Sequence, residues 1–177
     1  QNMFSIDQKV FTFHDNCCWL ASAIHMAFNN IVKKEIDTDD INNFIINEYN
    51  RPLWQSWSPV RAWVNIMIPY IKKRYNIDST YRVIGMFWKH FNRLLDGWKL
   101  IALPIRVTEA YNKDWTNWNK IQWDYTLSKR KWWHWFCVFR KNWEDYLLNS
   151  WDPIYNVRKI DLKTKWLFVW TKAYILY

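Results

Sequence analysis

The sequence predicts an α+β fold in which a helical first half packs on an antiparallel sheet or barrel formed by the second half. Apolar residues recur at helical spacing over much of the first hundred residues, whereas the apolar runs after residue 99 are short and strand-like. Helices and strands therefore follow each other in blocks, which is typical of α+β proteins. The 177 residues carry no internal repeat and are expected to form one domain.

Four helices are expected in the first half. They cover residues 18–32, 38–48, 58–71 and 86–95, and the first three combine a polar or proline start with apolar residues three or four positions apart. Asp15 or Asn16 would cap the first helix, and Asp37-Thr38 would supply the cap of the second. Pro69 predicts a kink in the third helix. Gly97, after the fourth, is expected to take the left-handed conformation of a helix end.

The expected strands cover residues 10–13, 100–107, 135–140, 145–148, 157–162 and 167–176. Pro104 indicates an edge strand or a bulge, because proline has no N–H to donate to a neighbour. Asn142-Trp143 forms the predicted turn between the two strands around it. The polar segment 112–131 is too long for an ordinary connection and is expected to be functional or mobile.

Composition limits the classes of function. The formal net charge is +9, which favours contact with polyanions, and residues 129–135 mix Lys and Arg with Trp as nucleic-acid-binding segments do. Nucleic acid is a possible partner, but a solvated basic loop is the favoured interpretation. No membrane span or signal peptide is apparent. Three cysteines cannot form a disulfide framework and favour a reducing, cytoplasmic compartment, and no metal or other cofactor is expected.

Tryptophan and glycine show an inverted usage, with 16 Trp and only two Gly. Trp stands in turn-like contexts such as Asn142-Trp143-Glu144, where a positive φ would be costly for a bulky side chain. One hypothesis is that the source organism reads the codon UGA as glycine, while the sequence carries Trp at those positions.

A nucleophile, a base and an orienting group occur in an order typical of thiol hydrolases. Cys18 begins the first predicted helix, where unpaired N–H groups and the helix dipole favour the thiolate. His134 stands at the head of a predicted strand and would form the ion pair, and Asn149 stands at the end of the next strand and would orient the imidazole. Cys17 is the alternative nucleophile, but Cys18 is preferred because Trp19 follows it directly.

The residues around these positions resemble papain-type (C1) cysteine peptidases. Cys18-Trp19-Leu20-Ala21-Ser22-Ala23 resembles the family's Cys-Trp-x-x-Ser-Ala, and Asn149-Ser150-Trp151 resembles its Asn-Ser-Trp. Residues 94–107 are similar to the helix-Gly-strand segment of bacterial and phage-like members. In the papain group the His and Asn follow the nucleophile by roughly 130–150 residues. The spacing from Cys18 to Asn149 is at the lower end of this range, and the spacing from Cys18 to His134 is somewhat shorter.

This resemblance implies a single catalytic domain, residues 1–177, with two lobes and an active-site cleft between them. The helical lobe would cover about 14–98, and the β lobe about 99–177 together with the N-terminal strand.

The resemblance leaves two positions open. The family's oxyanion-hole Gln usually stands six residues before the nucleophile, where this chain has Thr12, so Gln8 or Asn16, or else His14, would take the role. Asp152-Pro153 looks like the Asp-Pro of the related bacteriocin-processing (C39-type) peptidases, which makes Asp152 the alternative third member. Trp132 and Trp133 stand where papain-type peptidases carry Gly before the His.

The expected function is that of a cysteine peptidase or amide hydrolase. It would cleave a peptide or protein substrate through a thioester acyl-enzyme, and the protein is expected to be a monomer. Two alternatives remain open. One is a catalytically inactive papain-like module that binds protein or nucleic acid through a basic, aromatic surface, and the other is a transglutaminase or acyltransferase that uses the same three residues.

Overall fold

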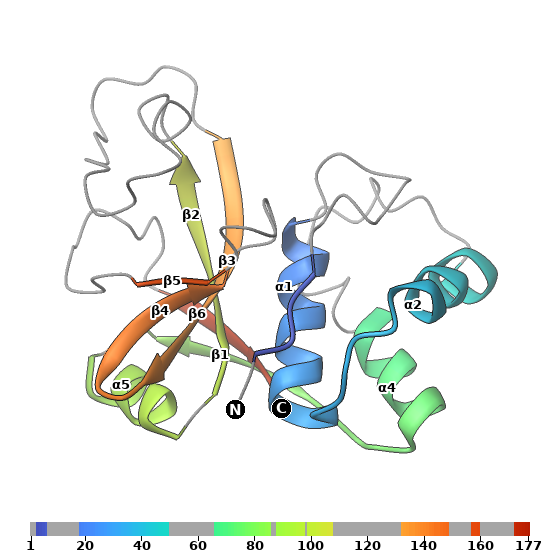
Figure 1. The fold of residues 1–177 in the computed structure, drawn as a ribbon, viewed down its shortest axis with the longest axis horizontal. Coiled ribbons are helices and arrows are strands. Elements are labelled where there is room, and N and C mark those ends of the chain that lie inside the picture. Colours follow the sequence, from blue (N-terminus) through green and yellow to red (C-terminus); the bar gives the residue numbers. More distant parts are fainter. Residues whose placement is uncertain are drawn as a thin grey trace.

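A computed structural model describes residues 3–6, 18–49, 66–85, 88–97, 99–107, 132–148, 157–159 and 172–177. For residues 49, 85, 88–91, 103–107, 132–134, 136, 147, 157–159 and 172 it describes the backbone alone. The fold is α+β, with the N-terminal helices packed on an open antiparallel sheet. The central helix α1 (Cys18–Met26) lies between the sheet and the pair of helices α2 (Thr38–Phe44) and α4 (Ile68–Tyr75) (Figure 1).

The first two predicted helices are confirmed. α1 continues directly into the wider turns of η2 (Ala27–Val32), which end at Lys33 in the left-handed conformation, with φ 54°. α2 likewise continues into η3 (Ile45–Tyr49). The Asp37 carboxylate accepts a hydrogen bond of 3.0 Å from the backbone N–H of Asp40, so Asp37 is the predicted N-cap. The proposed caps of α1, Asp15 and Asn16, lie outside the described residues.

The third predicted helix is described from residue 66 onward. Ile66 and Met67 form a helical turn, and α4 begins at Ile68. Pro69 is the second residue of α4 and follows these helical residues directly. The kink expected at Pro69 stays a prediction.

The fourth predicted helix is α5 (Trp88–Asp96). The prediction of a left-handed Gly97 is wrong, because no described glycine has a positive φ. The N–H of Gly97 donates to the carbonyl of Arg93 at 3.0 Å, so Gly97 still follows the path of the helix.

The sheet has six strands in the order β1-β6-β2-β3-β4-β5, and every described pairing is antiparallel. The strands are β1 (Tyr81–Gly85), β2 (Ile101–Val107), β3 (Trp132–Lys141), β4 (Glu144–Leu148), β5 (Val157–Lys159) and β6 (Lys172–Leu176). The strand predictions are confirmed for β2 to β6, whereas residues 10–13, 112–131, 160–162 and 167–171 lie outside the described part of the chain.

Strand β1 was not predicted, and it extends the sheet with a segment that was assigned to the helical lobe. It pairs along its whole length with β6 at the other end of the sequence, from Tyr81 opposite Leu176 to Gly85 opposite Lys172. Its five residues give only a short apolar alternation, so the pairing partner and not the local pattern determines this strand.

Pro104 lies in an interior strand and not in the edge strand expected from the sequence. β2 stands between β6 and β3, but its described pairing with β6 is confined to Ala102 opposite Tyr174. Pro104 itself faces Trp135 of β3. In the described pairings Pro104 has a partner in β3 and none in β6. The interior strand therefore accommodates a residue that has no N–H to donate on its second side.

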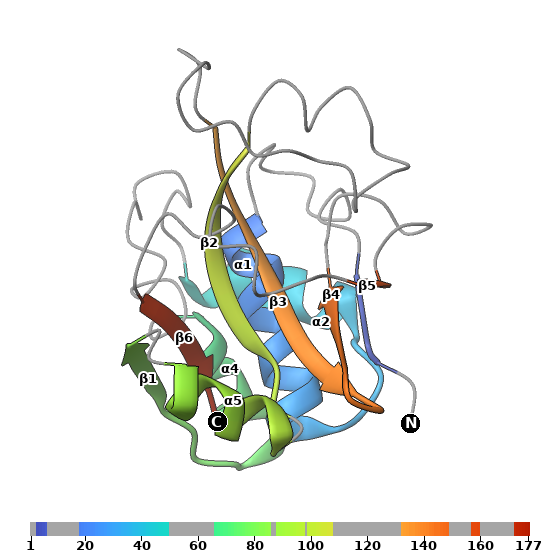
Figure 2. The ribbon, with the colours of Figure 1, turned by 90° about the vertical axis from the view of Figure 1, so that its left-hand side faces the viewer.

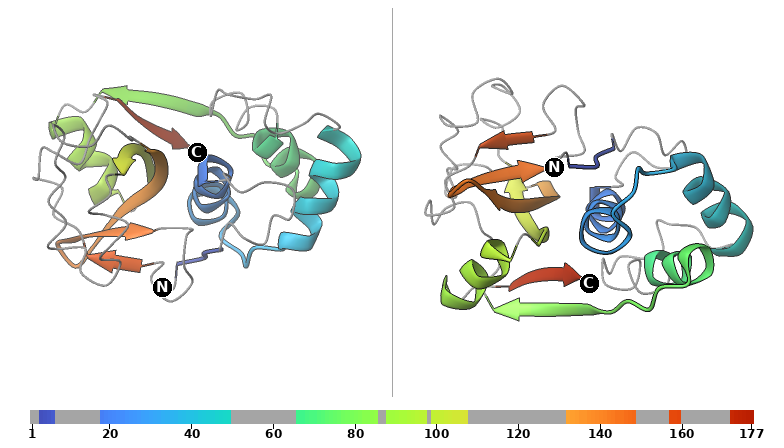
Figure 3. Two further views of the ribbon diagram at one scale, coloured as in Figure 1. Left: turned by 90° about the horizontal axis from the view of Figure 1, so that it is seen from above. Right: turned by 60° about the horizontal axis from the view of Figure 1, so that its bottom comes forward.

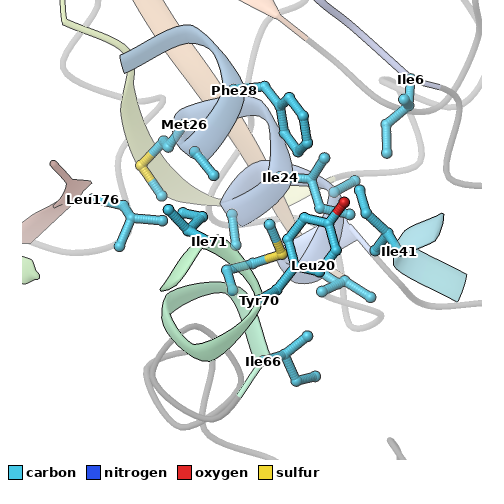
Figure 4. Packing of buried hydrophobic residues seen from close by; sticks show 14 of the residues in the cluster. Ile6, Leu20, Ile24, Met26, Phe28, Ile41, Ile66, Tyr70, Ile71 and Leu176 are labelled. Atoms are coloured by element: carbon cyan, nitrogen blue, oxygen red, sulfur yellow. The ribbon is translucent and has the colours of Figure 1, made fainter. Parts of the chain in front are cut away.

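The hydrophobic core surrounds α1 on both sides. Figure 2 shows β2 and β3 running across α1, and Figure 3 shows the same helix between the sheet and α2 and α4. All residues of α1 except Trp19 are buried, as expected for a helix covered on both sides. Figure 4 shows residues of this core, among them Leu20 and Ile24 of α1, Phe28 of η2, Tyr70 of α4 and Leu176 of β6.

Candidate active site

Cys18 is the first residue of α1, and its side chain is 8% exposed. Backbone groups of Trp135 in β3, of Trp19 and of Cys18 itself lie close enough to the thiol to lower its pKa. The last two belong to the start of α1, whose N–H groups have no carbonyl partner within the helix. The helix start and the first half of β3 therefore meet at the sulfur atom.

Burial determines the protonation of this thiol. Loss of contact with water raises the pKa of Cys18 from 9.0 to about 11, although the backbone groups of Trp135, Trp19 and Cys18 act in the opposite direction. The helix start was expected to favour the thiolate. The described surroundings instead favour the neutral thiol, because desolvation of the anion outweighs the effect of these backbone groups.

His134 lies next to the residue that contacts Cys18. It is the third residue of β3, and its backbone is paired with Ile105 of β2. The backbone of its neighbour Trp135 lies close to the thiol of Cys18. The structure thus brings Cys18 to the part of β3 that contains His134, although the side chain of His134 is not among those described.

The hairpin predicted to carry Asn149 is confirmed up to the residue before it. β3 and β4 pair through the two-residue turn Asn142-Trp143, and Leu148 at the end of β4 faces Cys137. Cys137 is three residues from His134, which corresponds to roughly 10 Å along a strand. Asn149 lies outside the described residues. The same holds for the other candidate residues, which are Gln8, His14, Asn16, Cys17 and Asp152.

The residue that sequence reasoning missed at this site is Trp135. Its contribution is a backbone group close to the thiol, which no side-chain motif reveals. The available signal was its place directly after His134 in a predicted strand. Its indole is partly buried and lies edge-on to Tyr174 of β6, with ring centroids 5.3 Å apart. This packing holds the strand next to the thiol of Cys18.

The second described thiol has different surroundings. Cys137 is fully buried, and its sulfur donates to the backbone carbonyl of Ser22 in α1 at 3.4 Å. Burial raises its pKa. Cys137 therefore acts as a core residue between α1 and β3, and of the two described cysteines it is Cys18 that lies at a helix start.

The described part of the chain contains no cluster of three or more His, Cys, Asp or Glu side chains suited to a metal ion. None of its helices combines the length and the apolar character that a membrane crossing requires.

Comparison with models of known protein families gave no matching family, and comparison with curated proteins gave no match.

Proposed function

We propose that the protein is a cysteine peptidase or amide hydrolase, with Cys18 as nucleophile, His134 as base and Asn149 as the orienting residue. The observation that carries the proposal is the position of the Cys18 thiol, at the start of α1 and against the backbone of Trp135, the residue after His134. A second support is the antiparallel hairpin of β3 and β4, whose last described residue precedes Asn149.

The proposed reaction forms and breaks a thioester. The Cys18 thiolate attacks the carbonyl carbon of the substrate, and the oxyanion accepts hydrogen bonds from the backbone N–H of Cys18 and from a side chain for which Gln8 and Asn16 are candidates. The C–N bond breaks as the His134 imidazolium protonates the leaving amine. Water, deprotonated by His134, then attacks the thioester, releases the carboxylic acid and restores the thiol.

The raised pKa of Cys18 makes the imidazole essential to this proposal. A thiol with a pKa of about 11 is almost entirely protonated at pH 7. A protonated His134 next to the sulfur would stabilise the thiolate and lower that pKa. The activity therefore depends on the ion pair and not on the helix start alone.

Labelling with iodoacetamide at different pH values tests the nucleophile and its base together. We expect the unmodified protein to be labelled at neutral pH, the Cys18→Ala variant to lose this labelling, and the matched Cys17→Ala variant to retain it. In His134→Ala, labelling of Cys18 should shift to pH values near 11, because the ion-pair partner is gone. Equal losses from both cysteine variants, or an unchanged pH profile in His134→Ala, would contradict the assignment.

Hydrolysis of peptide substrates separates the two candidates for the third member. The Asn149→Ala variant should lose most of its kcat while Asp152→Ala retains it, because the third member keeps the imidazole in its productive tautomer. The reverse result would favour the C39-type arrangement. Product formed with an added amine in place of water would indicate a transglutaminase or acyltransferase.

The burial of Cys18 favours a second candidate function, a catalytically inactive papain-like module. At 8% exposure and with a raised pKa, a thiol without an ion-pair partner would be unreactive, and the net charge of +9 would favour an anionic partner. Binding of RNA or DNA that weakens steeply with salt, together with no labelling of Cys18 at neutral pH, would support this function.

A further inference from the structure

The turn between β3 and β4 has a backbone conformation that suits glycine. Lys141 and Glu144 are the last paired residues of the hairpin, and Asn142 and Trp143 form the two-residue connection. Their φ angles are 52° and 65°, so both residues have the positive φ of a type I′ turn. The sequence preferred for such a turn is Asn-Gly, and this chain has Asn-Trp.

A tryptophan at the second position lowers the stability of the fold. The left-handed conformation brings the β-carbon of any L-residue other than glycine close to the following carbonyl oxygen. The effect corresponds to a roughly tenfold smaller folding equilibrium constant. Asn142 tolerates the conformation well, because its short side chain can hydrogen-bond locally, but Trp143 has no such compensation.

The indole of Trp143 also gains little from packing. It is 91% exposed, the most exposed of the large apolar side chains in the described part of the chain. Trp135 provides a contrast within the same hairpin, because its ring is partly buried and lies edge-on to Tyr174. The structure therefore accounts for a tryptophan at 135 and not at 143.

From the turn, the exposure and the ratio of 16 Trp to two Gly, we infer that position 143 is glycine in the native protein. Its codon would be UGA, decoded as glycine in the source organism. The inference is independent of the proposed function. It also affects the proposed site, because Trp132 and Trp133 directly precede His134. Either residue would be glycine in the native protein if its codon is UGA.

The gene and the native protein provide the first test. Codon 143 should be UGA and codon 135 should be UGG. The peptide that contains position 143, released by protease from protein isolated from the source cells, should have the mass calculated for glycine there. A UGG codon at 143, or a native peptide with the mass of tryptophan at that position, would overturn the inference and identify Trp143 as a retained, exposed contact residue.

Three variants of the protein with tryptophan at 143 test the backbone argument. Trp143→Gly should raise the folding equilibrium constant about tenfold, whereas Trp143→Ala should change it little, because alanine keeps the β-carbon. Trp135→Gly should lower it, since a packed ring is lost. Urea denaturation measures all three. If the glycine and alanine variants at 143 are equally stable, relief of backbone strain is not the reason for a glycine there.

Discussion

At the scale of single residues, burial determines the protonation of the two titratable side chains of α1, Cys18 and His25. Cys18 becomes a weaker acid because its anion has lost contact with water. His25, one percent exposed, becomes a weaker base for the same reason, and its pKa falls from 6.5 to about 4. Its Nε2 accepts a hydrogen bond of 3.0 Å from the N–H of Ile6, so the neutral ring holds the N-terminal segment against α1.

His25 should make the stability of the fold depend on pH. Below pH 6.5 the unfolded chain binds a proton at this residue, whereas the folded protein does not until about pH 4, so the stabilisation is lost as the pH falls through this window. The free energy of unfolding should decrease by about 1 kcal/mol between pH 7 and pH 5.5. Urea denaturation at the two pH values measures this change. His25→Gln keeps an acceptor for Ile6 and does not titrate, so its dependence on pH should be weaker, and an equal dependence would contradict the assignment.

At the scale of secondary-structure elements, one arginine connects the β3–β4 hairpin to α5. Arg140 donates through Nε to Asp145 at 2.7 Å, through Nη1 to Asp96 at 2.8 Å and through Nη2 to Asn92 at 2.7 Å. Its side chain is 16% exposed, and the hydrogen bond with Asp145 is the main reason that its pKa is raised. The planar guanidinium bonds three residues on two elements, which a lysine ammonium would not reproduce.

Replacing this arginine should weaken the contact between the hairpin and α5. Arg140→Lys should lower the free energy of unfolding by about 1–2 kcal/mol, because most of the hydrogen bonds are lost while the charge is kept. The matched variant Arg74→Lys concerns an ion pair with Asp40 in which the Arg74 side chain is 51% exposed. It should cost less than about 1 kcal/mol. Urea denaturation compares the two variants, and equal costs would show that the network around Arg140 adds no stability beyond that of a surface pair.

The elements themselves were largely predictable from sequence. Apolar periodicity located α1 with η2, and the Asp37 cap located the start of α2. The turn at Asn142-Trp143 predicted the pairing of β3 with β4. The failures were β1, the edge position expected for Pro104, and Gly97. β1 depends on a partner at the other end of the sequence, and Gly97 depends on where α5 stops.

At the scale of the whole molecule, one buried amide attaches the helical layer to the sheet. The side-chain amide of Asn30 in η2 donates to the carbonyls of Leu100 at 3.0 Å and Leu176 at 2.9 Å, and its oxygen accepts from the N–H of Leu100 at 2.8 Å. Leu100 precedes β2 and Leu176 ends β6, so Asn30 satisfies backbone groups from two strands. These contacts complement the apolar packing of α1 on β2 and β3 (Figure 2).

Removal of this amide should destabilise the protein strongly. Asn30→Leu leaves the three buried backbone groups without their partner, at a cost of about 1–3 kcal/mol for each group that stays unsatisfied. We expect a loss of roughly 3 kcal/mol or more in the free energy of unfolding, measured by urea denaturation. The control Asn43→Leu changes an exposed residue of α2 and should cost less than about 0.5 kcal/mol. A small loss in Asn30→Leu would mean that the two layers hold together by apolar packing alone.

The sequence by itself determined the α+β class, the positions of most helices and strands, and the chain order of Cys18, His134 and Asn149. These follow from periodicity, caps and turn residues, whose effects act over a few neighbouring positions. The tertiary structure alone decided that β1 joins β6, that β2 is interior, and that the thiol of Cys18 is buried against Trp135. Burial and its effect on pKa depend on which distant segments pack together, and that information does not lie in any local stretch of the chain.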